Sequence, residues 1–165
     1  MDIQIRTMTA EDWEVVRTIY VAGIATGQAT FETEAPTWAA WNNSHLPAPR
    51  LLAVSKEIPG GWAALSRVST RPVYAGVAEV SVYVAEQMRG KGVGGLLLKA
   101  LVEGSEKNEI WTLQASIFPE NAASISLHQS YGFREIGRRE RIAKMKGVWR
   151  DTLLFERRSR LVGVD

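Results

Sequence analysis

The chain has 165 residues, of which 45% are hydrophobic and 23% charged, with a net charge of +2 and no cysteine. This composition is that of an ordinary globular protein, and the length suits one domain, since domains most often have roughly 100–150 residues. The lack of cysteine excludes disulfides, a thiolate nucleophile and a cysteine-based metal site, and two histidines are too few for a histidine-based one. We therefore expect a single domain over residues 1–165 with no metal. We find neither a signal-peptide pattern nor the run of ~20 apolar residues of a membrane span, so we expect a cytoplasmic protein without membrane contact.

In the first half of the chain, residues 2–6 alternate and predict a short strand. The segment Thr9–Asp12 is typical of a capping box and begins a helix with an apolar stripe along one face. Residues 28–36 predict a loop, and Pro36 is expected to open a short helix over residues 37–45. Residues 50–56 and 62–68 predict a hairpin that turns at Pro59-Gly60-Gly61.

In the second half, residues 77–84 predict a strand, which a glycine-rich loop connects to a helix, and residues 110–117 predict the next strand. A helix over residues 121–130 ends at Gly132, and a closing hairpin pairs residues 134–144 with 149–157 around Lys146-Gly147. Only residues 77–117 form a strand–helix–strand unit. The predicted fold class is therefore mixed α/β, with a central, largely antiparallel sheet and one crossover.

The stretch "QMRGKGVGG" at residues 87–95 is typical of an anion-binding loop, because backbone N–H groups at a helix start attract negative charge. One frame, Gly90-x-Gly92-x-x-Gly95, matches a dinucleotide fingerprint, and another, Arg89-x-x-Gly92-x-Gly94, matches a loop that holds coenzyme A. The dinucleotide hypothesis requires a doubly wound fold, whereas this loop follows a hairpin in mid-chain. A glycine turn without a ligand is the third interpretation, which the two flanking cations disfavour.

Two motifs resemble those of the GCN5-related N-acetyltransferase superfamily. The segment from Arg89 to Gly94, after the strand "AEVSVYV", resembles the acetyl-CoA pyrophosphate loop, and the segment from Asn121 to Phe133 resembles a second motif of the family. The resemblance extends from residue 2 to 156 and implies an acyl-CoA N-acyltransferase-like fold with acetyl-CoA as co-substrate. Finer features resemble the branch of phosphinothricin and methionine sulfoximine acetyltransferases, which modify the amino group of small amino-acid-like molecules: Ala29-Thr30-Phe31, Arg71 to Tyr74, Glu79, and Lys146 to Asp151.

The same resemblance implies which residues contact acetyl-CoA. The backbone at the end of the central strand would bind the pantetheine arm and the thioester carbonyl, and the glycine loop would bind the pyrophosphate. Asn121 and Ser124 would contact the pantetheine, although either residue type also favours a simple N-cap. The full set is Val82, Tyr83, Val84, Arg89, Gly90, Lys91, Gly92, Val93, Gly94, Asn121 and Ser124.

Glu79 is the expected general base. It alternates with Ser81 and Tyr83 on one face of the predicted strand, and a carboxylate in such an apolar segment needs a partner. A partly buried carboxylate with a raised pKa can take a proton from an ammonium substrate before the amine attacks. The alternative is a structural ion pair with a nearby arginine.

Three residues are expected to bind the acceptor. The resemblance implies that Arg71 holds a carboxylate beside Tyr74, and Phe31 would close the pocket. A solvated arginine and a core phenylalanine are the alternatives. His128 stands where much of the superfamily has a tyrosine that protonates the leaving thiolate, so it is a candidate acid, whereas Tyr131 is expected to pack.

The C-terminal region is basic, since ten of the twenty Lys and Arg residues lie between residues 134 and 160. Acidic residues are interspersed, so we expect a solvated hairpin and no nucleic acid partner. The branch implies a homodimer. The expected function is acetyl transfer to a small-molecule amine in a ternary complex; the alternatives are acetylation of a protein N-terminus or other amine, and a CoA-binding module without catalysis.

Overall fold

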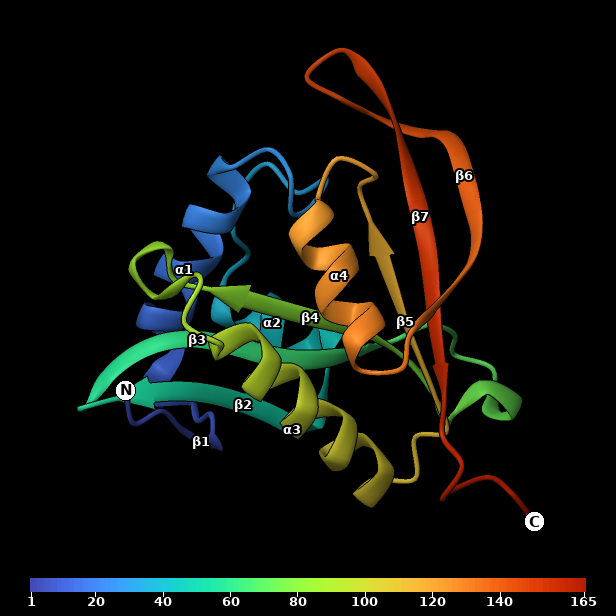
Figure 1. Cartoon of the computed structure of the whole chain (residues 1–165), viewed down its shortest axis with the longest axis horizontal. Coiled ribbons are helices and arrows are strands. Elements are labelled where there is room, and N and C mark those ends of the chain that lie inside the picture. The colour runs from blue at the N-terminus through green and yellow to red at the C-terminus, as the bar shows by residue number, and fades with distance from the viewer.

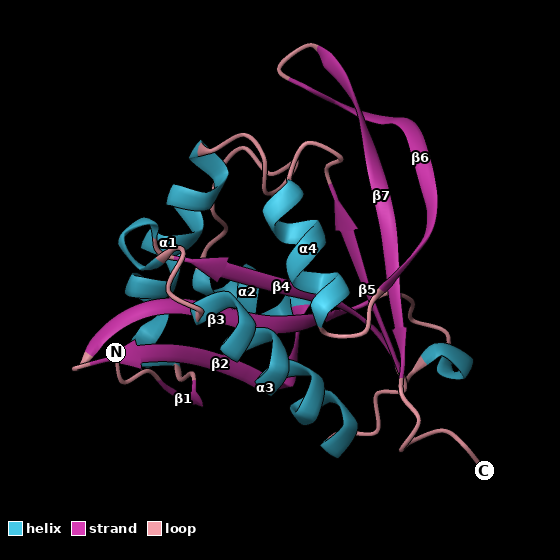
Figure 2. Ribbon diagram, viewed as in Figure 1, coloured by secondary structure: helices cyan, strands magenta, loops and turns pink.

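The computed structural model describes residues 1–165 and contains one seven-stranded sheet (Figures 1 and 2). The strands, in their spatial order, are β1 (Gln4–Thr7), β2 (His45–Ser55), β3 (Ile58–Arg67), β4 (Val77–Val84), β5 (Thr112–Ile117), β7 (Val148–Arg158) and β6 (Arg134–Met145). Only β4 and β5 pair in parallel, across the single crossover, and every other pair is antiparallel. This topology confirms the predicted mixed α/β fold.

The helices are α1 (Trp13–Ala25), α2 (Trp38–Ser44), α3 (Val93–Lys107) and α4 (Ala122–Ser130). They cover both faces of the sheet, as the alternating residues of β3 show. Trp62 packs against Tyr20 of α1 and Trp41 of α2. A Cβ atom on the neighbouring Gly61 would meet side chains of α3 on the opposite face. Because β3 is covered on both sides, its residues 60–65 are all buried, and its large side chains belong to a core cluster of 26 buried residues.

The first hairpin turns earlier than predicted. Ser55 pairs with Ile58, so the turn is Lys56-Glu57, and both residues have positive φ (48° and 66°). This is the backbone that two-residue hairpin turns require, although neither residue is a glycine. Pro59-Gly60-Gly61 lies within β3, and the prediction of a turn there was wrong. The short helix also differs from its prediction: it begins at Trp38 after an N-cap at Thr37, whose side chain accepts a hydrogen bond from Ala40 N.

The parting of β4 and β5 creates the main opening of the fold. They pair only where Val77–Glu79 lie beside Thr112–Gln114, whereas β4 pairs with β3 from Ala78 to Val84. The two strands then diverge, as Figure 1 shows. Residues 80–84 of β4 therefore keep one backbone edge without a strand partner. An unpaired edge inside a sheet offers N–H and C=O groups to a ligand.

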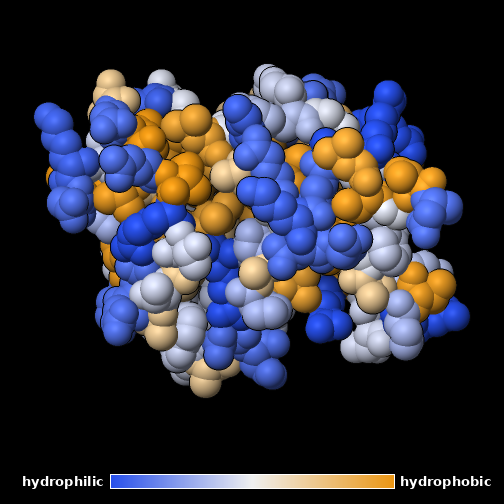
Figure 3. All heavy atoms as spheres, turned by 90° about the horizontal axis from the view of Figure 1, so that it is seen from below, coloured by the Kyte–Doolittle hydropathy of each residue, from blue (hydrophilic) through white to orange (hydrophobic).

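The surface shows no continuous apolar belt on the face seen in Figure 3, where apolar groups lie between hydrophilic ones. The large exposed apolar side chains include Val73 and Tyr74 after β3, and Val148 and Trp149 at the tip of the β6–β7 hairpin. No helix has both the length and the apolar character needed to cross a bilayer.

Candidate functional site

Two clefts meet along the free edge of β4. The Glu79 cleft, of about 580 Å³, is lined by the α1–α2 loop, β4, β5 and the β6–β7 hairpin. The glycine-loop cleft, of about 590 Å³, is lined by the end of α1 and the loop after it, the end of β4, residues 88–90 and 92–95, and α4. Six residues line both: Ala29, Val82, Tyr83, Asn121, Ser124 and His128. A ligand in one cleft can therefore meet a ligand in the other beside β4.

The glycine loop presents unused N–H groups to its cleft. Gly90 and Gly92 have φ of 72° and 82°, which favours glycine, and Gly92 is the N-cap of α3. The first backbone hydrogen bond of α3 runs from Leu96 N to Gly92 O at 3.1 Å, so the N–H groups of residues 92–95 have no backbone partner. Four free N–H groups at a helix start form a site for an anion.

Gly94 and Gly95 have a different role, because they let α4 approach α3. A Cβ atom on Gly94 would lie 3.2 Å from the Leu127 side chain, and one on Gly95 would lie 2.9 Å from the Tyr131 hydroxyl. Tyr131 packs against the core, as predicted. The glycines thus divide into a pair that shapes the loop and a pair that permits helix packing.

The two cations of the loop differ in position. Arg89 lines the glycine-loop cleft, and its Nε donates to Val84 O at 3.4 Å. Lys91 does not line the cleft, and its Nζ donates to Gln87 O at 2.9 Å. Both side chains are exposed. Arg89 is therefore the cation that a bound anion would meet directly.

Glu79 is half-buried in its cleft and forms no ion pair, so the alternative of a structural ion pair was wrong. Its Oε1 accepts hydrogen bonds from Ser116 Oγ at 3.2 Å and Gln114 Nε2 at 3.4 Å, both on the diverging strand β5. These bonds orient the carboxylate without neutralising it. A carboxylate held in this way can accept a proton from a bound amine.

The end of β4 combines a fixed side chain with an open backbone. The Tyr83 ring stacks on Trp62 at 4.8 Å and on Tyr20 at 4.9 Å, and burial raises the pKa of the Tyr83 hydroxyl. Val82, Tyr83 and Val84 line the glycine-loop cleft along the free edge. The aromatic stack therefore fixes the backbone whose hydrogen-bonding groups face the clefts.

Asn121 and His128 belong to the wall that the clefts share. Asn121 Oδ1 accepts from Ser124 N at 3.1 Å, which caps α4, and its Nδ2 donates to Gln28 O at 3.1 Å. His128 Nδ1 lies 2.7 Å from Ser124 O, and because a carbonyl only accepts, Nδ1 must carry the proton. Burial lowers the pKa of His128, so the ring is neutral at pH 7 and its Nε2 has no proton to donate. This geometry opposes the predicted role of His128 as an acid.

The predicted acceptor residues are not all at the site. Phe31 lines the Glu79 cleft and packs edge-on against Phe118 at 4.9 Å. Arg71 and Tyr74 line neither cleft: the Arg71 guanidinium lies over the Tyr74 ring at 5.4 Å, and Tyr74 is 45% exposed. Their predicted contact with an acceptor stays a prediction.

Two arginines that the sequence did not single out, Arg67 and Arg139, line the Glu79 cleft and form no hydrogen bond or ion pair. Arg67 ends β3 opposite Ala78, and Arg139 pairs with Thr152 across the β6–β7 hairpin. Only strand register brings them to the cleft, and the sequence contains no local signal for that register.

Elsewhere in the basic C-terminal region, four arginines form ion pairs: Arg134, Arg138, Arg150 and Arg157. No cluster of His, Asp and Glu is arranged to hold a metal ion.

Comparison with known proteins agrees with this geometry. Residues 5–154 match the model of a family described as an acetyltransferase (GNAT) domain. A phosphinothricin N-acetyltransferase of Alcaligenes faecalis is 31% identical over 159 residues, covering 93% of this chain and 81% of that protein. An L-methionine sulfoximine/L-methionine sulfone acetyltransferase of Pseudomonas aeruginosa is 40% identical over 83 residues, covering 50% and 48%. The crystal structure of a GNAT superfamily phosphinothricin acetyltransferase from Sinorhizobium meliloti in complex with AcCoA is 26% identical, with a TM-score of 0.88, covering 100% of this chain and 92% of that one.

Proposed function

The chain belongs to the GNAT acetyltransferase family, and from this premise we propose that it transfers the acetyl group of acetyl-CoA to the amino group of a small amino acid analogue of the phosphinothricin or methionine sulfoximine type. The observation that carries the proposal is the free edge of β4, which has Glu79 at one end and the glycine loop at the other. The two clefts that meet there fit two substrates at once. A ternary complex therefore accounts for the geometry, and no cysteine exists to carry an acyl group.

The residues of the glycine-loop cleft fit coenzyme A. We assign the pyrophosphate to the N–H groups at the start of α3, together with Arg89. The backbone of Val82–Val84 would pair with the pantetheine amides and donate to the thioester carbonyl oxygen, where negative charge develops during attack. Asn121 and Ser124 would line the arm. We place Lys91 at the rim, as an electrostatic rather than a direct contact.

In the Glu79 cleft, the carboxylate of Glu79 would take the proton of the acceptor ammonium, directly or through one water. The neutral nitrogen then attacks the thioester carbon, the carbon–sulfur bond breaks, and the second proton of the amine passes to the departing thiolate or to water. A CoA thiolate needs little help at neutral pH, and His128 has no proton at Nε2, so we assign it to the wall of the site. The unpaired Arg67 and Arg139 give the cleft a positive wall that suits the carboxylate of an amino acid.

Membership of the family also bears on the domain organisation and the oligomeric state of the chain. We propose one N-acetyltransferase domain over residues 1–165, since the family match spans residues 5–154. We also propose a homodimer in which a second copy packs on the β6–β7 hairpin, whose tip exposes Val148 and Trp149. Arg71 and Tyr74 stay proposed acceptor contacts, although neither lines a cleft.

The test is thiol release from acetyl-CoA with a panel of acceptors: methionine sulfoximine, methionine sulfone, phosphinothricin and a short peptide. We expect turnover with the amino acid analogues. Activity on the peptide alone would reject the assigned substrate class. Binding of acetyl-CoA without turnover of any amine would indicate that the chain is a CoA-binding module without catalysis.

The role of Glu79 is tested with Glu79→Gln, which keeps the shape and removes the base. We expect kcat to fall by roughly 10²–10⁴-fold, the usual contribution of general base catalysis, with acetyl-CoA binding retained. Glu86→Gln is the matched control, because Glu86 is exposed and lines neither cleft. An unchanged kcat in Glu79→Gln would eliminate Glu79 as the base.

A further inference from the structure

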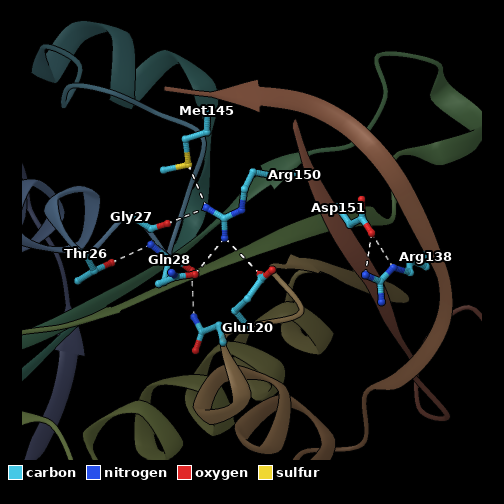
Figure 4. A network of polar contacts seen from close by, with 9 residues as sticks. Thr26, Gly27, Gln28, Glu120, Arg138, Met145, Arg150 and Asp151 are labelled. Atoms are coloured by element: carbon cyan, nitrogen blue, oxygen red, sulfur yellow. Dashed lines mark hydrogen bonds and ion pairs between the residues drawn. The ribbon is translucent and has the colours of Figure 1, made fainter. Parts of the chain in front are cut away.

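Arg150, on β7 beside the hairpin turn, lies outside the two clefts and forms an extensive polar network, one partner of which, Gln28, lines the glycine-loop cleft (Figure 4). Its Nη1 donates to Gly27 O at 3.1 Å and contacts Met145 Sδ at 3.4 Å. Its Nη2 donates to Gln28 Oε1 at 3.0 Å and Glu120 Oε2 at 3.2 Å. The side chain is only 15% exposed. This is an unusually complete set of partners for an arginine on a hairpin.

The partners of Arg150 come from segments that are far apart in the sequence. Gly27 and Gln28 begin the α1–α2 loop, and Glu120 lies in the β5–α4 loop. The guanidinium also lies over the ring of Phe118, 4.0 Å from its centroid, in the same β5–α4 loop. Arg150 thus connects the hairpin to both the α1–α2 loop and the β5–α4 loop.

Both loops lead directly into the site. Gln28 accepts from Arg150 through its side chain and, through its main-chain oxygen, from Asn121 Nδ2 at 3.1 Å. Asn121 lines both clefts. Beyond Gln28, residues 29–31 form a wall of the Glu79 cleft, and Phe31 packs on Phe118, the ring that lies under the guanidinium. A shift of Arg150 would therefore be transmitted to both clefts.

We propose that Arg150 is a positioning residue, which holds the α1–α2 loop against the β5–α4 loop and so sets the affinity for both acetyl-CoA and the acceptor. Arg150 lines neither cleft, so it acts through Gln28 and Asn121 and does not contact the substrates itself. This inference rests on the proposed function. It goes further by assigning substrate affinity to a residue outside the clefts.

The test compares Arg150→Met, which keeps the length and removes the donors, with Arg150→Lys and Gln28→Ala. We expect Arg150→Met to raise the KM for acetyl-CoA and for the acceptor about 10-fold, the change in affinity that a loss of about 1.4 kcal/mol of binding free energy produces. We expect little change in kcat, because Glu79 is held separately by β5. Arg150→Lys, which can reach fewer acceptors, should give an intermediate KM.

A purely structural role would give a different result. A smaller folded fraction would lower the apparent kcat and leave both KM values unchanged. Gln28→Ala alters an exposed side chain and should fold, so it tests the same connection even where Arg150→Met is unstable; because Gln28 lines the glycine-loop cleft but not the Glu79 cleft, its decisive readout is the KM for the acceptor. We expect its KM values to rise in the same direction, and the double variant to add little, since both changes break one connection. Arg138→Met is the control, because Arg138 pairs with Asp151 on the same hairpin and is 54% exposed.

Unchanged KM values in a folded Arg150→Met, or additive effects of Arg150→Met and Gln28→Ala, would overturn the proposal. The Kd for acetyl-CoA, measured by calorimetry, provides a readout that does not need turnover. If the unsubstituted chain binds acetyl-CoA but acetylates no amine, the proposed function fails, while the weaker binding expected of Arg150→Met still tests the positioning role.

Discussion

At the scale of single residues, Gly92 of the glycine loop and Gly76 before β4 are required for different reasons. Gly92 has φ = 82°, and a Cβ atom there would meet nothing within 4 Å. Gly76 is the opposite case, since a Cβ atom on it would lie 2.0 Å from the Trp111 ring. A glycine is therefore needed at position 92 because of the backbone conformation, and at position 76 because there is no room for a side chain.

This contrast predicts that Gly92→Ala lowers the free energy of unfolding by roughly 1–2 kcal/mol, the cost of a left-handed conformation for a residue with a Cβ atom. Urea denaturation measures this cost. Gly137→Ala is the control: its φ is not in the left-handed region and its surroundings are open, so it should leave stability unchanged or slightly higher. Equal stabilities for the two variants would contradict the assignment of Gly92.

The candidate site was predictable where its residues lie in a local motif. Glu79, Phe31, Arg89 and Asn121 all line the clefts, because each belongs to a strand end, loop or helix start that the chain signals locally. Arg67 and Arg139 were missed, since their position depends on the pairing of distant strands. The hydrogen-bond network of Arg150 could not be predicted for the same reason.

At the scale of elements, the types and order of helices and strands followed from hydrophobic periodicity, and the errors lie at boundaries and turns. Glycine and proline normally mark turns, so Pro59-Gly60-Gly61 attracted the predicted turn. The strand instead continues through these residues, because Gly61 must fit under Val93 and Leu97 of α3. Tertiary packing thus places these glycines within the strand. The turn falls on Lys56-Glu57, which must adopt an unfavourable backbone conformation.

The strained turn predicts a stabilising substitution. Replacing Lys56-Glu57 with Asn-Gly should raise the free energy of unfolding by about 0.5–1 kcal/mol, because this pair adopts two positive φ values at little cost. A higher midpoint in thermal or urea unfolding is the expected result. Asn-Gly at Lys146-Gly147 is a useful comparison, since Gly147 already has φ = 79° and less strain remains to relieve. A lower midpoint for the first variant would refute the assigned turn.

At the scale of the whole molecule, the two histidines couple stability to pH. Burial lowers the pKa of His45, whose Nδ1 lies 2.7 Å from Trp41 O, and of His128 in the shared wall. With both folded-state pKa values below the ordinary value of about 6.5, the unfolded chain takes up protons first as the pH falls. The free energy of unfolding is therefore steady above neutrality and decreases below about pH 6.5.

We accordingly expect the Tm to fall between pH 7.5 and pH 5.5, as measured by calorimetry at fixed ionic strength. The double variant His45→Gln, His128→Gln should have a lower Tm at pH 7.5 but a smaller change across this interval, because glutamine does not titrate. A Tm that rises toward pH 5.5 would contradict the lowered pKa values.

The parting of β4 and β5 has a consequence for how the molecule avoids self-association. Sheet edges usually lie at the periphery, where another polypeptide can add a strand and begin aggregation. Here an incomplete edge lies at the centre of the sheet, where it borders the clefts lined by α4 and the α1–α2 loop. In the proposed complex, the amides of the pantetheine arm would extend the interrupted β-ladder at this edge. Binding of the co-substrate would then leave fewer free N–H and C=O groups there for another polypeptide to pair with.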